Sequence, residues 1–82
     1  MAFRVDLFGD DAPTEIKPID GRVTAFETAK RKAQDLAALY HDEHGCEAGQ
    51  ADLVLAEEIV GSWVWGGGDC WWESAEGMAA II

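Results

Sequence analysis

The chain has 82 residues, of which 49% are hydrophobic, and its formal net charge is −10. This length suits one domain spanning residues 1–82, and the apolar content favours a folded domain over a disordered tail. The sequence contains no run of about 20 apolar residues, which a membrane helix requires. Charged residues also interrupt the N-terminus too early for a secretory signal. We therefore expect a soluble, cytoplasmic protein.

The first expected element is a strand over residues 3–8, where apolar and charged side chains alternate. Phe3, Val5 and Leu7 then share the buried face of this strand. The next segment contains Pro13 and Pro18, which favour an extended, irregular connection. Residues 16–19 form at most a short edge strand in this interpretation.

A long helix is predicted from about Ala25 to His44. Thr24 and Glu27 have the spacing of a capping box, which marks the start of a helix. Gly45 is a residue that readily adopts the left-handed conformation that ends one. Apolar side chains recur every three or four residues and form one stripe, made of Phe26, Ala29, Ala33, Leu36, Ala37 and Tyr40. The many alanines in this stripe indicate close packing against a sheet.

Two further strands are predicted over residues 51–57 and 59–65, which are rich in β-branched and aromatic residues. A helix over residues 51–60 is the alternative, because Leu55 and Ile59 also have helical spacing. Residues 57–58, or Gly61, are expected to mark a turn or a bulge. The glycines at 66–68 form a turn from which residues 70–73 return as the last strand. The apolar residues 78–82 are expected to dock on the core or to complete a sheet edge.

These elements predict an α+β fold, in which one long helix packs on one face of a small antiparallel sheet of three to four strands. All four tryptophans lie in residues 63–72. Strict alternation puts Ile59, Trp63 and Trp65 on one face, and the neighbours Trp71 and Trp72 on opposite faces. A single helix covers one face only, so at least one indole should lie on the open face. There it is available to a partner or a second copy, and the alternative is a tryptophan-rich core.

The sequence contains no arrangement of residues that indicates an enzyme, and we expect no catalytic residues and no cofactor. No glycine-rich phosphate loop opens a helix, and no basic residue near Cys70 would hold it as a thiolate. His41, His44, Cys46 and Cys70 are conceivable metal ligands. They lack paired Cys-x-x-Cys spacing, however, and histidines are favoured at a helix C-terminus by the helix dipole alone. We expect no metal site, and two free thiols in preference to a disulfide.

The negative charge is confined to one part of the sequence. All six lysines and arginines lie in residues 1–32, where acids balance them, so the net charge of −10 falls entirely on residues 33–82. Such a surface repels nucleic acid and anionic membranes and attracts a basic protein surface. A stacking platform for nucleic acid is also excluded, since it needs a basic groove. The expected partner-binding residues combine carboxylates with indoles and are Asp52, Glu57, Glu58, Trp65, Asp69, Trp72, Glu73 and Glu76.

In size, acidity and arrangement of elements the chain resembles small phage-encoded inhibitors of bacterial defence, in particular anti-CRISPR proteins. The resemblance covers the whole chain through the strand 3–8, the single helix opened by Thr24-Ala25-Phe26-Glu27 and the hairpin around residues 66–68, with no specific motif. It implies an inhibitor in the host cytoplasm that blocks DNA binding or assembly of a CRISPR effector. Its acidic sheet side would mimic DNA without contacting nucleic acid directly.

The basic segment Lys30-Arg31-Lys32 departs from a uniformly acidic mimic. The alternative function is a homodimeric structural or assembly module of a phage or bacterium, with no inhibitory role.

Overall fold

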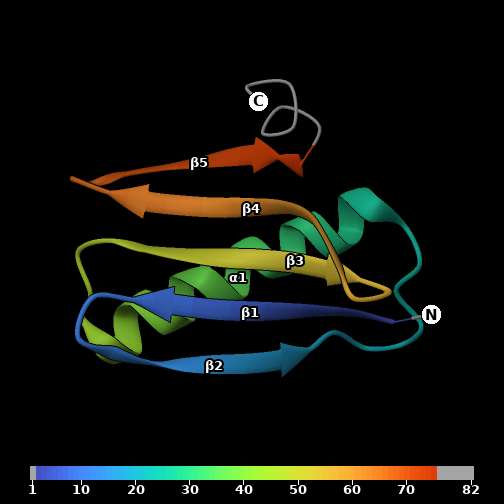
Figure 1. Ribbon diagram of the computed structural model, residues 1–82, viewed down its shortest axis with the longest axis horizontal. Coiled ribbons are helices and arrows are strands. Elements are labelled where there is room, and N and C mark those ends of the chain that lie inside the picture. Colours follow the sequence, from blue (N-terminus) through green and yellow to red (C-terminus); the bar gives the residue numbers. More distant parts are fainter. Residues whose placement is uncertain (1, 76–82) are drawn as a thin grey trace.

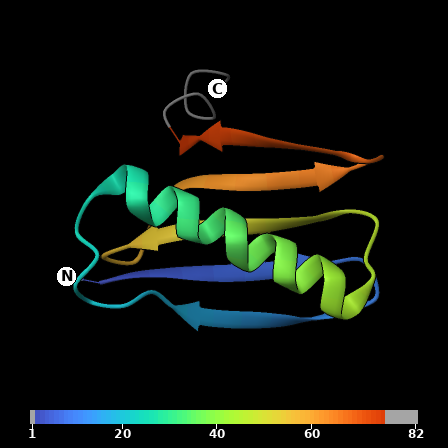
Figure 2. The same ribbon diagram turned by 180° about the vertical axis from the view of Figure 1, so that it is seen from behind.

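The computed structural model describes residues 2–75, and these residues form one helix packed on a five-stranded antiparallel sheet (Figure 1). In chain order the elements are β1 (Phe3–Gly9), β2 (Ala12–Pro18), α1 (Phe26–His44), β3 (Gly49–Leu55), β4 (Glu58–Gly66) and β5 (Asp69–Ser74). The strand order across the sheet is β2-β1-β3-β4-β5, and α1 crosses one face of it diagonally (Figure 2). The α+β class is confirmed, whereas the prediction of three to four strands was too low.

The strand that the sequence did not predict in full is β2. Asp10 and Asp11 form a tight turn, with φ of 55° at Asp11, and β2 returns directly beside β1. Pro13 lies beside the register shift in the β1–β2 ladder, and Pro18 is the last residue of the strand. Because β2 is an edge strand, prolines at these two places remove few ladder hydrogen bonds.

The end of α1 was predicted correctly, but the mechanism at its start was not. Gly45 is left-handed, with φ of 64°, and its N–H donates to the carbonyl oxygen of His41 at 2.7 Å. The predicted capping box is wrong, since the N-cap residue is Ala25 and no side chain caps it. Thr24 therefore lies one position before the N-cap, and Glu27 lies one position too early to reach back to it.

The core lies between α1 and the sheet face that the helix covers. On the helix, Ala29, Ala33 and Ala37 are at most 3% exposed, and their small side chains let the helix axis approach the strands closely. The sheet contributes larger side chains to the same core: Phe3, Val5, Leu7, Leu53 and Trp65. No helix in residues 2–75 is long and apolar enough to cross a bilayer.

Residues 51–60 form strands and not a helix. β3 and β4 are joined by a two-residue turn at Ala56 and Glu57, whose φ values of 53° and 65° are typical of a tight hairpin. The ladder then shifts register, because Gly61 pairs with Leu53 but Ile59 pairs with Val54. The turn thus lies one residue before the expected 57–58, and the bulge directly precedes Gly61. One consequence was missed: the inserted residue puts Ile59 on the open face, away from Trp63 and Trp65.

Candidate functional site

Three of the four indoles belong to the helix-covered side of the sheet. Trp65 is 7% exposed, and its Nε1 donates to the carbonyl oxygen of Cys46 at 3.3 Å. Trp63 donates from Nε1 to the carbonyl oxygen of Lys30 at 2.8 Å, and its ring packs edge-on against that of Trp72, with 5.3 Å between centroids. The bond from Trp63 attaches the first half of α1 to the last hairpin of the sheet, and the bond from Trp65 attaches the α1–β3 connection to it.

The fourth indole, Trp71, lies on the opposite face and is 43% exposed. The predictions that Trp71 and Trp72 point to opposite faces and that one indole lies on the open face are therefore confirmed. Of the two indoles expected to bind a partner, Trp65 is buried and Trp72 is partly buried in the core. Trp71, which was not among the expected partner-binding residues, presents more surface than Trp65 does.

The open face of the sheet is mixed apolar and acidic. Large apolar side chains that are exposed on this face are Phe8, Ile16, Ile59 and Trp71. A row of polar side chains crosses the middle of the face, in which Asp6 pairs with Asp52, Asp52 with Ser62, and Ser62 with Glu73.

Asp52 has a structural role at the centre of that row. It is 6% exposed, and its Oδ1 accepts hydrogen bonds from Ser62 Oγ and Gln50 Nε2, both at 2.6 Å. Directly opposite, Asp6 accepts a hydrogen bond from Arg4 Nε at 3.1 Å. These donors offset the repulsion between two carboxylates that face each other across the strands.

The other carboxylates expected at the partner surface are dispersed. Glu57 lies in the β3–β4 turn, where its Oε1 accepts a hydrogen bond from Arg4 Nη1 at 2.7 Å, and Glu58 follows it. Glu73 is on the open face and accepts from Trp71 Nε1 at 3.0 Å. Asp69 begins β5, and Glu76 lies outside the described residues. The predicted set therefore does not form one continuous surface in residues 2–75.

The structure instead gathers a different set of acids at one end of the molecule. Gly9, Gly49 and Trp65 lie side by side in the sheet, and Gly66 pairs with Asp69, so the β1–β2 turn, the α1–β3 connection and the β4–β5 turn share this end. The last turn of α1 reaches it too (Figure 2). We define the acidic end as the exposed carboxylates Asp10, Asp11, Asp42, Glu43, Glu47 and Asp69.

None of the six lysines and arginines lies in these connections or in α1 beyond Lys32. Arg22 lies in the β2–α1 connection near the other end, where its Nη2 pairs with Asp20 Oδ2 at 2.7 Å. Arg31 is exposed on the first half of α1. The negative C-terminus of the helix dipole adds to the acidic end. The carboxylates of the acidic end thus lie in segments without lysine or arginine, whereas Arg4, Arg22 and residues 30–32 lie toward the other end of the strands.

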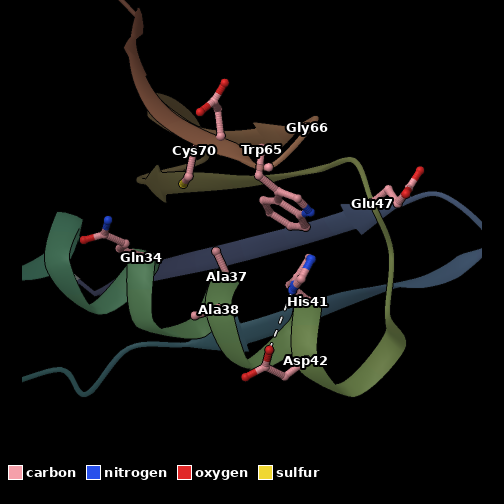
Figure 3. Close-up of a pocket in the computed structure, with 11 residues that line it drawn as sticks. Gln34, Ala37, Ala38, His41, Asp42, Glu47, Trp65, Gly66 and Cys70 are labelled. Carbon is pink, nitrogen blue, oxygen red and sulfur yellow. Dashed lines mark ion pairs between the residues drawn. The ribbon is translucent and has the colours of Figure 1, made fainter.

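A cleft lies beside the acidic end, between α1 and the β4–β5 hairpin (Figure 3). Its volume is about 340 Å³. Ala37, Ala38 and the glycines of the hairpin leave this space open, and Trp65 and His41 face into it, with their ring centroids 6.3 Å apart and their planes nearly perpendicular at 86°. The polar side chains around it are Gln34, Asp42, Glu47 and Asp69, together with the thiol of Cys70.

The cleft has little chemistry suited to catalysis. Cys70 is exposed and free, and partial burial raises the pKa of its thiol, which favours the protonated, poorly nucleophilic form. Cys46 is free and buried elsewhere, so the preference for two thiols over a disulfide is confirmed. His41 Nδ1 lies 3.6 Å from Asp42 Oδ1, with no nucleophile of lowered pKa beside it among the described residues.

Among residues 2–75, one group places potential metal-binding atoms close together. Glu15, Glu43 and His44 bring these atoms within 4.8 Å of one another. His44 Nε2 is 2.5 Å from Glu15 Oε2, and Lys17 Nζ is 3.2 Å from Glu15 Oε1. Hydrogen bonds from His44 and Lys17 lower the pKa of Glu15. The group is accounted for by the contacts that join α1 to β2, in which the two carboxylate oxygens of Glu15 are already paired with His44 and Lys17.

No family model, no characterised protein and no solved structure matches this chain. The resemblance to anti-CRISPR proteins therefore stays a prediction that rests on size, charge and the order of elements.

Proposed function

We propose that this protein is a non-enzymatic binding domain whose acidic end occupies a basic groove on a nucleic-acid-binding protein and so excludes nucleic acid from it. The observation that carries this proposal is the acidic end itself. Its exposed carboxylates come from four separate segments of the chain: the β1–β2 turn, the end of α1, the α1–β3 connection and the start of β5. Neither the connections at this end nor α1 beyond Lys32 contains a lysine or arginine.

The spacing of these carboxylates favours recognition of an extended basic surface over binding of a single ion. They are spread across the width of the sheet, from the β1–β2 turn at one side to Asp69 at the other (Figure 1). Most are fixed on tight turns or on the helix end, so little side-chain or loop ordering is needed on binding. A single-sign field of this kind accelerates encounter with a basic partner and selects against acidic ones.

A target that normally binds DNA or RNA has the required complement of spaced lysines and arginines. In this proposal the carboxylates take the place of phosphates, and the effector complexes of CRISPR defence are one class of target with such grooves. Blocking of DNA binding and blocking of complex assembly are both outcomes of occupying the groove. We therefore propose the acidic end as the binding surface, in place of the acidic sheet side expected from the sequence.

The test compares two variants that each remove three carboxylates. The first removes three of the six carboxylates of the acidic end, with Asp10→Asn, Glu47→Gln and Asp69→Asn. The second is a matched control with Glu27→Gln, Asp35→Asn and Glu58→Gln, which are exposed and lie outside the acidic end. Each variant and the original protein is immobilised and exposed to a bacterial lysate at low and at physiological salt, and captured proteins are identified by mass spectrometry. The captured protein is then purified, and displacement of labelled DNA from it is measured by fluorescence anisotropy.

We expect the original protein and the control to capture the same basic protein and to displace DNA from it, and the acidic-end variant to lose both activities. Displacement should also weaken steeply as salt rises, because ionic contacts are screened over about 8 Å at 0.15 M. Equal capture and equal displacement by the two triple variants would contradict the proposal, as would salt-independent displacement.

A second candidate function, a homodimeric assembly module, is favoured by the apolar side chains of the open face. Ile16 is 65% exposed and Ile59 48% exposed, and with Phe8 and Trp71 they flank the polar row described above. In that case light scattering gives twice the monomer mass at both low and high salt, and Trp71→Ser with Ile59→Ser restores the monomer. A monomeric mass for the original protein at all concentrations tested would exclude it.

A further inference from the structure

We infer that the cleft between α1 and the β4–β5 hairpin is a binding site for a guanidinium group, supplied by an arginine side chain of the basic partner. This inference rests on the proposed function and names the chemistry that the acidic end recognises most specifically. The cleft is defined here by Ala37, Ala38, His41, Trp65 and Cys70, with Asp42, Glu47 and Asp69 around its opening.

The charge around the cleft favours a cationic occupant. Glu47 and Asp69 are exposed, and neither has an ion-pair partner within residues 2–75. They come from the α1–β3 connection and from the start of β5. Asp69 pairs with Gly66, one position from the Trp65–Cys70 pair, so its side chain leaves β5 on the open face, and Glu47 extends away from Trp65 (Figure 3). Both charges therefore act on the cleft from its rim. Asp42 adds a third carboxylate from the helix, 3.6 Å from the imidazole of His41. These charges would repel an anion and would not attract a neutral polar group.

The apolar part of the lining favours guanidinium over ammonium. Trp65 is held by its hydrogen bond to the Cys46 carbonyl and by contact with Gly49, where any Cβ would collide with the indole ring. His41 presents a second ring at nearly a right angle to it. Guanidinium is planar and less strongly hydrated than ammonium, so it packs on aromatic rings while its N–H groups bind carboxylates in pairs.

The size of the cleft limits what can enter. About 340 Å³ lies near the lower limit of typical small-ligand pockets, which span roughly 300–1,000 Å³. This space accepts one long side chain and is too small for a folded element. An arginine that projects from a protein surface would enter while its neighbours contact the rest of the acidic end.

The experiment uses small probes, so it needs no knowledge of the partner. The isotope-labelled protein is titrated with N-acetyl-arginine methylamide and, separately, with N-acetyl-citrulline methylamide, its neutral isostere. Amide and indole N–H chemical shifts are followed by NMR. We expect saturable shifts centred on His41, the Trp65 indole, Asp69 and Cys70 with the arginine probe, and binding of the citrulline probe at least about tenfold weaker. Loss of a charge-assisted hydrogen bond has about this effect.

Two variants and a matched control distinguish the cleft from general attraction to a negative surface. Ala38→Leu fills the cleft from an exposed helical position without a change of charge, and leucine is a good helix former. Glu47→Gln with Asp69→Asn removes two charges at the opening, and Glu27→Gln with Glu58→Gln removes two charges away from it. The first two variants should abolish the localised shifts, and the last should keep them within about twofold.

Equal binding of the citrulline probe, or unchanged binding to the Ala38→Leu variant, would overturn the guanidinium site. Shifts that are spread over all the carboxylates and do not saturate would also overturn the guanidinium site. The result is separable from the proposed function. Normal probe binding with equal capture by the two triple variants contradicts the proposed function alone, and absent probe binding with selective capture contradicts the site alone.

Discussion

Gly61→Ala should destabilise the fold because of one close approach. A Cβ at this position would lie 2.9 Å from Trp72 Cε2 and closer still to Cζ2 and Cη2 of the same ring. Gly61 is on β4, and the colliding indole comes from the neighbouring strand β5, so the ring has to move away from the sheet.

The cost follows from the contacts that the displaced indole loses. Trp72 packs against Trp63 at 5.3 Å and Phe26 at 5.9 Å between centroids, and Lys30 Nζ lies 4.8 Å from the centroid of its ring. Each aromatic pair is worth about 0.5–1.5 kcal/mol and the cation–π contact about 0.5–1 kcal/mol. A gain of roughly 0.5–1 kcal/mol from replacing a strand glycine offsets part of this. We expect a net loss of about 1–3 kcal/mol, in the range of other overpacked cores.

The measurement is urea unfolding followed by circular dichroism. With a slope of about 1 kcal/mol per M for a domain of this size, the midpoint should fall by roughly 1–3 M. Gly21→Ala is the matched control, since no atom lies within 4 Å of a Cβ at that position, and its midpoint should hardly change. In a Trp72→Leu background, Gly61→Ala should cost much less. An equal cost in both backgrounds would refute the collision, as would an unchanged midpoint in the original background.

Two further predictions concern acid stability and the indoles. Hydrogen bonds from His44 and Lys17 lower the pKa of Glu15 from its ordinary value of 4.5. The stability that these bonds provide is therefore complete above pH 4.5 and is lost as pH falls through the lowered pKa. Glu15→Gln should have a urea midpoint that changes less than that of the original protein between about pH 6 and pH 3, and an equal acid response in both would contradict this. Trp65→Ala should destabilise the fold by about 3–5 kcal/mol, since the ring is 7% exposed in the core, whereas Trp71→Ala, at 43% exposed, should cost about 1 kcal/mol or less. Equal losses in unfolding free energy would show that the two faces are packed alike.

Most of the elements of this fold could be predicted because their patterns are local. The alternation in β1 and the three-and-four spacing along α1 depend only on which face of each element is buried. β2 could not be predicted in full, since its prolines are tolerated only because it lies at the edge of the sheet, which is a property of the assembled fold. The inserted residue in β4 could not be predicted either. It shifts the register by one position and so puts Ile59 on the open face.

The candidate site was harder to predict than the fold. Charge was counted along the sequence, so the acids of residues 33–82 were expected on one sheet side, whereas the β3–β4 turn puts Glu57 next to Arg4. The acidic end includes Asp10 and Asp11, which belong to the half of the sequence that has no net charge. The β1–β2 and β4–β5 turns meet at one end because β1 pairs antiparallel with β3 across the helical connection. That pairing is a property of the assembled fold, so the strand patterns alone did not place the turns at 10–11 and 67–68 together.

The exposure of Cys70, with Cys46 buried and both thiols free, gives the protein a single accessible point for covalent labelling. A maleimide or a nitroxide reagent should attach at the wall of the cleft and nowhere else among residues 2–75. Because burial raises the pKa of this thiol, the reaction should proceed faster at mildly alkaline pH. One reagent then supplies both a spectroscopic reporter and a plug for the cavity, without any mutation. In air the same sulfur should also link molecules in pairs on a non-reducing gel, so preparations need a reductant before their mass in solution is interpreted.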